Sequence, residues 1–126
     1  MEEAVQRALA RGHLIDITTT GRRSGRPHRV EVVFHTFDGR IYISGLPGRR
    51  DWYANLVAHP HFTLHLKRLA RADLPAVARP IRGAAERQAV IERIARVWRR
   101  VDVDRMIASS PLVEVTFDGD AGADAS

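Results

Sequence analysis

Apolar and polar residues alternate in several short segments of this chain, which is typical of strands with one buried face. The clearest case is 29–37 (RVEVVFHTF), where Val30, Val32 and Phe34 share one side. Asp38-Gly39 follows, a pair that favours a two-residue hairpin turn, so the next residues are expected to return antiparallel. The segments that we predict as strands are 14–20, 29–37, 40–44, 61–67, 69–81 and 112–117.

Segments with helical spacing of apolar residues interrupt the predicted strands. The strongest begins after Gly83, where apolar side chains between Val90 and Trp98 recur on one face. A shorter helix is expected with Asp51 as its N-cap, ending before Pro60, because the residue preceding a proline avoids helical geometry. The segments predicted as helices are 2–11, 52–58, 84–100 and 102–108.

This order of elements predicts an α+β fold. We expect about six mostly antiparallel strands in a small barrel or strongly curved sheet, with the helices at its periphery. A single domain is expected over residues 1–117, and residues 118–126 (DGDAGADAS) form a short acidic tail that we expect to be flexible.

Composition narrows the class of protein. With 126 residues, 44% of them hydrophobic, the chain is long enough for one domain with its own core. The absence of cysteine excludes disulfides, thiolate metal sites and a cysteine nucleophile. No apolar run of about 18 residues and no signal-peptide pattern is present, so the expected location is the cytoplasm. The amphipathic segment 2–11, with Arg7 and Arg11, suggests weak contact with a membrane surface.

The charge of the chain is basic and comes almost entirely from arginine. The formal net charge is +5, and 19 of the 20 basic residues are arginines. Guanidinium groups bind phosphates and carboxylates through a planar fork, so the partner classes are nucleic acids, anionic membranes and anionic small molecules. Nucleic acid is disfavoured, because the sequence contains no helix-turn-helix pattern and no aromatic-rich strand for base stacking.

The segment TTTGRRSGRP, residues 18–27, is the sharpest local feature. It joins the end of a predicted strand to a glycine turn that carries Arg22, Arg23 and Arg26 beside Ser24. Such a loop offers guanidinium groups, a hydroxyl and backbone N–H groups to a phosphate or carboxylate. It lacks the G-K-[ST] ending of a Walker loop. The alternative interpretation is an exposed arginine turn without a ligand.

A second feature is the start of the short predicted helix, DWYANL at 51–56. Trp52, Tyr53 and Asn55 come directly after a glycine- and arginine-rich loop, GLPGRR. The first turn of a helix attracts anions, whereas the alternative interpretation is that the aromatic side chains fill the core. A metal site is not expected, because His61 and His65 lie about 13 Å apart along a strand, where we expect both on a polar outer face.

Together, TTTGRRSGRP, the Asp-Gly hairpin and WYANLVAHPHFTLHL resemble the deazaflavin-dependent nitroreductase family over residues 15–67. The resemblance implies a split β-barrel, similar to flavin-binding proteins of the pyridoxamine-phosphate-oxidase type. It also implies binding of coenzyme F420, a deazaflavin with a phosphate and an oligoglutamate tail. The implied activity is hydride transfer from reduced F420 to quinones, nitro compounds or other unsaturated small molecules.

The resemblance also implies which residues contact the cofactor. Arg22, Arg23 and Ser24, with Gly25 and Arg26, would hold its phosphate end, and Asp51, Trp52, Tyr53 and Asn55 would close over its rings. Tyr53 and Ser44 are the candidate proton donors to the acceptor, and Trp98 is a further candidate for the site wall. The remaining implied cofactor contacts are His28, Arg29, Val30, Glu31, Val32, Val33, Ser44, Gly45, Leu46 and Pro47.

The sequence departs from the family pattern in three places. Val30-Glu31-Val32 replaces the common N-P-L triplet, Arg23 replaces a lysine, and the loop before DWY is shorter and contains no P-x-W. We expect Glu31 to face solvent, because an unpaired buried carboxylate is costly. Two alternatives remain open on the same fold: a reductase that binds FMN, and a protein that carries the deazaflavin without turnover. The electron acceptor and the choice between monomer and homodimer are not determined by the sequence.

Overall fold

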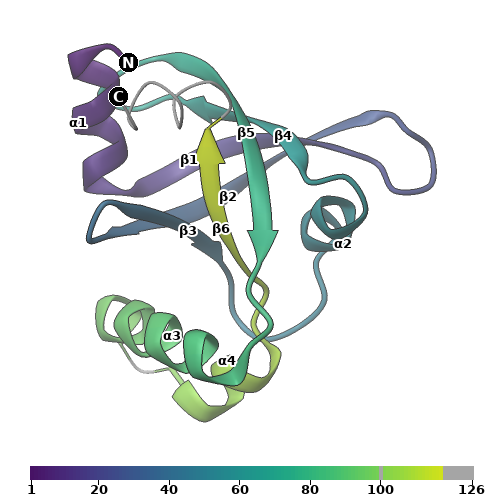
Figure 1. Cartoon of the computed structure of the whole chain (residues 1–126), viewed down its shortest axis with the longest axis vertical. Coiled ribbons are helices and arrows are strands. Elements are labelled where there is room, and N and C mark those ends of the chain that lie inside the picture. The colour runs from purple at the N-terminus through teal and green to yellow at the C-terminus, as the bar shows by residue number, and fades with distance from the viewer. Residues whose placement is uncertain (100, 118–126) are drawn as a thin grey trace.

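Six antiparallel strands closed into a barrel form the centre of the computed structural model, which describes residues 1–99 and 101–117 (Figure 1). The strand order around the barrel is β1-β2-β3-β6-β5-β4. The predicted small antiparallel barrel with peripheral helices is therefore confirmed, whereas the predicted acidic tail lies outside the described residues. The elements are α1 (Glu3–Arg11), β1 (His13–Thr20), β2 (Pro27–Phe37), β3 (Arg40–Ser44), α2 (Asp51–Ala58), β4 (His61–Leu66), β5 (Ala72–Pro80), α3 (Ala84–Trp98), α4 (Val103–Ser109) and β6 (Leu112–Phe117).

Apolar side chains form two clusters. The larger one fills the barrel with inward-facing residues such as Ile17, Ile43 and Leu64, all of them fully buried. Helix α1 adds Val5 and Leu9 to this cluster, so the apolar face that a membrane surface would need is already packed in the core. The second cluster lies between the outside of the barrel and the pair α3 and α4, which lies at one side of the barrel in Figure 1.

The hairpin of β1 and β2 is longer than the barrel requires. Val32 and Phe34 of β2 are buried in the barrel, but Val30 on the same face is 38% exposed. The pairing nevertheless continues to Thr20 and Pro27, so the tip of the hairpin extends past the barrel wall, above α2 in Figure 1. At the other end of β2, Asp38 and Gly39 both have positive φ values, 54° and 77°, as the predicted two-residue turn requires.

Three local predictions are corrected by the structure. Arg50, not Asp51, is the N-cap of α2, and Asp51 is the first helical residue. The predicted strand over 69–81 begins at Ala72, because Leu69 adopts a positive φ of 61° in the preceding turn. His65 was expected on a polar outer face, yet it is buried between the side chains of neighbouring strands.

Arginine side chains hold the helical pair to the barrel. Arg87 of α3 donates hydrogen bonds to four carbonyl oxygens, those of Ile81, Met106, Ile107 and Ser110, at 2.7–3.3 Å. It thereby supplies a donor to the carbonyl of Ile107 in the last turn of α4 and a second donor to that of Met106, which also accepts from the N–H of Ser110. Arg79 of β5 pairs with Glu86 at 2.6 Å and with Glu114 at 2.7 Å, and these two carboxylates raise the pKa of its guanidinium.

Replacing Arg87 by alanine should lower the free energy of unfolding by about 2 kcal/mol, because buried carbonyls lose charge-assisted hydrogen bonds. Urea unfolding followed by circular dichroism measures this loss. Arg96→Ala, at an exposed position on the same helix, is the matched control and should change stability by less than about 0.5 kcal/mol. Equal effects of the two substitutions would show that the carbonyl contacts of Arg87 do not stabilise α4.

A buried histidine connects β2 to α3. His35 is 6% exposed, stacks on Phe37 and packs at a tilt against Trp98, with ring centroids 5.9 and 5.5 Å apart. Its Nε2 has no hydrogen-bond partner among the described residues. Burial without a partner disfavours the charged imidazolium, and this lowers the pKa of His35 from 6.5 to about 4.

Stability should therefore fall as the pH drops from 6.5 toward 4, because the unfolded chain binds a proton at His35 that the folded protein does not. The loss attributable to His35 is about 2 kcal/mol at pH 4.5. Urea unfolding at pH 7.0 and pH 4.5 measures it, and His35→Phe should reduce the difference between the two pH values by that amount. An unchanged pH dependence in His35→Phe would contradict the assignment.

Candidate functional site: a basic cavity between a hairpin and a helix

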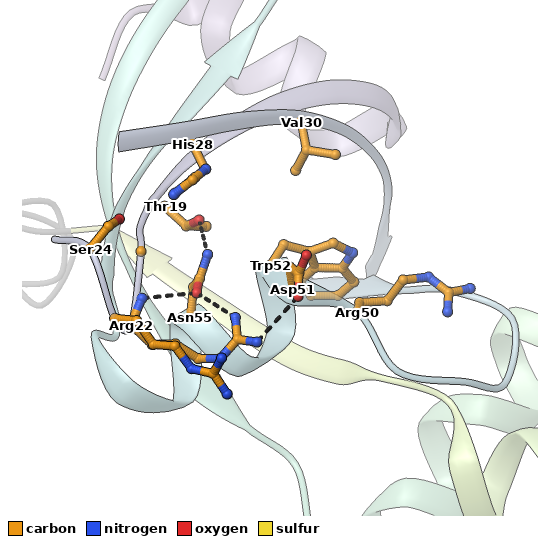
Figure 2. A pocket seen from close by; sticks show the side chains of 11 residues that line it. Thr19, Arg22, Ser24, His28, Val30, Arg50, Asp51, Trp52 and Asn55 are labelled. Carbon is orange, nitrogen blue, oxygen red and sulfur yellow. Dashed lines mark hydrogen bonds and ion pairs between the residues drawn. The ribbon is translucent and has the colours of Figure 1, made fainter. Parts of the chain in front are cut away.

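A cavity of about 530 Å³ lies between the tip of the β1–β2 hairpin and α2 (Figure 2). In Figure 2, His28 and Val30 of β2 lie on one side, and Trp52 and Asn55 of α2 lie on the other. The volume falls in the range of about 300–1,000 Å³ that is usual for small-molecule sites. The residues that line it are Thr19, Gly21, Arg22, Arg23, Ser24, His28, Val30, Arg50, Asp51, Trp52 and Asn55.

Asn55 fixes the relative position of the hairpin and the helix. Its side-chain amide is buried, and its Oδ1 accepts hydrogen bonds from the backbone N and from Nη1 of Arg22, at 3.1 and 3.0 Å. Its Nδ2 donates to Oγ1 of Thr19 at 3.1 Å. Arg22 also pairs with Asp51 at 3.2 Å, as the dashed lines in Figure 2 show. The start of the arginine loop is thus attached to α2 by side chains from both segments.

The loop 21–26 turns tightly around Gly21. The N–H of Gly21 donates to the carbonyl of Arg26 at 2.8 Å, and the N–H of Gly25 returns to the carbonyl of Gly21 at 2.9 Å. A Cβ at Gly21 would lie 2.6 Å from Oγ of Ser24 and 2.7 Å from Nε2 of His28. Glycine therefore allows these two polar side chains to approach the backbone at the cavity wall.

The arginines around the cavity have different roles. Arg22 donates to Asn55 and Asp51, so it connects the arginine loop to α2. Arg50 donates to the carbonyls of Leu46 and Arg49, at 3.1 and 3.0 Å, which holds its guanidinium against its own loop. Arg23 is exposed and lines the cavity directly. The positive charge available to a ligand in the cavity therefore comes mainly from Arg23 and Arg50.

The cavity combines a basic end with an apolar wall. Arg23 and Ser24 supply a guanidinium and a hydroxyl, while Val30 and Trp52 supply flat apolar surface. This donor set fits a planar ring system that carries an anionic group, because guanidinium groups bind oxyanions and aromatic rings stack. The residues present are consistent with a flavin-like cofactor such as the deazaflavin that the sequence resemblance implies.

Several residues of β2 that were expected to contact the cofactor are not brought into this cavity. Arg29 and Glu31 are on the opposite face of the strand, where Arg29 pairs with Asp16 at 3.0 Å and Glu31 with Lys67 at 2.5 Å. Lys67 also bonds Asp16 at 2.7 Å, and this bond, together with Arg29, lowers the pKa of Asp16. Glu31 is exposed, as expected, and its carboxylate is paired. Val32 is in the barrel core, and Val33, half-buried, is on the same face as Glu31.

The two candidate proton donors are placed differently from one another. Ser44 is buried, and its hydroxyl donates a hydrogen bond to the carbonyl of Pro111 at 2.6 Å, so its proton is already used within the fold. Tyr53 is half-buried, packs edge-on against Trp52 and lines a neighbouring hollow.

Trp98 packs on His35, away from the lining of the cavity. The expected contacts Gly25, Arg26, Gly45, Leu46 and Pro47 are on adjoining loops and do not line the cavity.

Sequence reasoning missed Thr19, Gly21 and Arg50 as lining residues. Thr19 and Gly21 lie inside the TTTGRRSGRP segment, whose polar strand end gave a signal for them. Arg50 belongs to GLPGRR, where the pair of arginines before the helix was the available signal.

His65 of β4 is a buried polar residue away from the cavity. His65 contacts Oγ1 of Thr18 through Nε2 at 2.7 Å and Oδ1 of Asp73 through Nδ1 at 2.6 Å. A carboxylate accepts hydrogen bonds, so Nδ1 carries the proton, and this bond lowers the pKa of Asp73. Among the described residues, no group of three or more His, Asp or Glu side chains is arranged to hold a metal ion. None of the described helices is long and apolar enough to cross a membrane.

Known structures share the fold at low sequence identity. A protein from Listeria innocua, named as a candidate pyridoxamine 5′-phosphate oxidase, is 12% identical with a TM-score of 0.69, covering 90% of each chain. A conserved hypothetical protein from Mycobacterium tuberculosis is 17% identical with a TM-score of 0.72, covering 94% of this chain and 81% of that one. A NimC/NimA family protein from Clostridium acetobutylicum is 10% identical with a TM-score of 0.62, covering 88% and 76%. The expected split-barrel fold is thereby confirmed.

No curated protein sequence matches this chain. A family model does match, over residues 2–117, which include the arginine loop, the hairpin and both sides of the cavity. The model describes oxidoreductases that use the reduced deazaflavin F420H2, as the sequence resemblance implied. On the match across residues 2–117, the chain belongs to the F420H(2)-dependent quinone reductase family.

Proposed function

We propose that this protein binds coenzyme F420 in the cavity between the hairpin and α2 and reduces a quinone or another unsaturated small molecule. The observation that carries the proposal is the pairing of Arg23 and Ser24 with the apolar wall of Val30 and Trp52. Arg23 and Ser24 can bind the anionic end of a planar cofactor, and Val30 and Trp52 can pack against the face of its ring system. Membership of the family supports F420 as that cofactor.

Reduced F420 supplies the hydride, so the protein has no need of a side chain that is itself oxidised or reduced. Arg23 and Ser24 bind and orient the anionic end of the cofactor. Trp52 and Val30 exclude water from the apolar side of the cavity, which strengthens the electrostatic interactions inside it. The hydroxyl of Ser44 already donates to the carbonyl of Pro111, so Tyr53 is the remaining candidate for donating a proton to the acceptor.

A fluorescence titration with F420 and FMN, at low and high salt, tests the proposed cofactor. We expect micromolar binding of F420 that weakens with salt, since a charged contact is screened. Preferential binding of FMN would support the flavin alternative. Binding of F420 without oxidation of its reduced form by any quinone or nitro compound would support a carrier, and binding of neither cofactor would contradict the proposal.

Arg23→Gln should weaken F420 binding about tenfold and reduce its salt dependence, because one charge-assisted contact to the anionic end is lost. The same fluorescence titration measures both effects. The matched control is Arg71→Gln, another exposed arginine outside the cavity, which should leave the affinity unchanged. An equal loss in both variants would indicate a general effect of net charge and not a contact in the cavity.

Gly21→Ala should weaken F420 binding while the fold is retained. The added methyl group would displace the side chains of Ser24 and His28, which lie at its position, but the backbone at Gly21 has no positive φ to strain. Thermal unfolding and the F420 titration together measure the two effects. Unchanged affinity would show that the close approach of Ser24 and His28 to Gly21 does not shape the binding site.

A further inference from the structure

A second hollow, of about 790 Å³, adjoins the cavity on the other side of the Arg22–Asp51 ion pair. Arg22, Arg50 and Asp51 line both spaces. The second hollow is bounded by the loop between β3 and α2, by the first turn of α2 and by the end of α4. The N–H of Gly48 donates to the carbonyl of Ser109 at 3.3 Å, which joins that loop to α4.

The charge around the second hollow is strongly positive. Four arginines line it, Arg22, Arg49, Arg50 and Arg87, against one carboxylate, Asp51. Arg22 pairs with Asp51, and Arg87 is held by backbone carbonyls, so these two cations are occupied by the protein itself. Arg49 is exposed, and its charge is left for a ligand in this hollow. Arg50 is shared with the first cavity, and its bonds to two carbonyls of its own loop reduce the entropy lost when it binds a ligand.

A buried hydroxyl at the same hollow lacks a partner. Ser110 is 4% exposed and lines the hollow, and its Oγ has no hydrogen-bond partner among the described residues. The oxygen itself is shielded from solvent, so it would reach a ligand in the hollow only after the Ser110 side chain rotates. Tyr53 lines the same hollow with its phenol ring. The hollow therefore combines two arginines and an aromatic side chain, beside a serine hydroxyl that has no partner among the described residues.

We propose that this second hollow binds the electron acceptor and that Arg49 and Arg50 select acceptors that carry an oxyanion, such as a carboxylate or a sulfonate, beside a planar reducible ring. This inference rests on the proposed function, because it assigns the first cavity to the cofactor. Arg22, Arg50 and Asp51 line both hollows, so the two ligands would have to meet over this shared rim, because hydride transfer requires reacting atoms about 3–3.5 Å apart. Each space has an arginine of its own, Arg23 for the first and Arg49 for the second.

The test uses two quinones of similar shape and different charge, without cofactor present. The probes are 1,4-naphthoquinone-2-sulfonate and the neutral 2-methyl-1,4-naphthoquinone, and calorimetry measures the binding of each. In the wild-type protein the sulfonate should bind more tightly than the neutral quinone. Arg49→Gln should weaken sulfonate binding about tenfold and leave binding of the neutral quinone unchanged, because one charge-assisted contact is lost.

Two further variants make the test specific. Arg23→Gln should leave sulfonate binding unchanged while it weakens F420 binding, since Arg23 lines the first cavity and not the second. Arg7→Gln removes an equal charge from α1, distant from both spaces, and should change neither affinity. Thermal unfolding of each variant verifies that the fold is intact.

An oxyanion in the second hollow could also come from the glutamate tail of the cofactor. Titration with F420 and with its deazaflavin core, which lacks phosphate and tail, distinguishes this source. If Arg49→Gln weakens binding of tailed F420 but not of the sulfonated quinone, the hollow holds the tail and the acceptor proposal is overturned. Absent sulfonate binding in the wild type, or equal binding in wild type and Arg49→Gln, also overturns it. Failure of the proposed function is a separate result, namely that the wild type binds no F420.

Discussion

The site depends on the buried side-chain amide of Asn55. Its oxygen accepts two hydrogen bonds from Arg22, and its nitrogen donates one to Thr19. These three bonds join the end of β1 and the arginine loop to Asn55 of α2, 33 or more residues further along the chain. An amide is suited to this position because it both donates and accepts, so each of these neighbours is satisfied without a buried charge.

The arginines divide between the fold and the two hollows according to what surrounds them. Arg87 and Arg79 donate to carbonyls and carboxylates, and these bonds hold α3 and α4 to the barrel. Arg29 faces Asp16 across the hairpin. Arg23 and Arg49, in contrast, are on loops at the edge of open spaces. A surplus of positive charge therefore collects at one end of the barrel, beside α2.

The long hairpin explains how a filled barrel can also provide a binding site. Inward-facing residues of β2 pack the core as far as Val32, and beyond it the strand has no core to cover. Val30 and His28 continue on the same face and line the cavity opposite Trp52. Alternate residues of β2 point to the same face of the strand. That face packs into the core where the barrel covers it, and it lines the cavity where the strand extends past the barrel.

The sequence by itself determined the elements, the antiparallel hairpin and the segments that form the site. Alternation of apolar and polar residues predicted β2 and β4, and the Asp-Gly pair predicted the turn. The segments TTTGRRSGRP and DWYANL indicated both sides of the cavity. These signals could be detected because they depend on residues that are near neighbours in the chain. What only the tertiary structure decided is which side chains are free for a ligand. Arg22 and Ser44 looked available in the sequence, but Asn55, Asp51 and Pro111 engage them through contacts between distant segments. Residue type fixes what a side chain can bind, whereas its partner is set by the packing of strands and helices far apart in the chain.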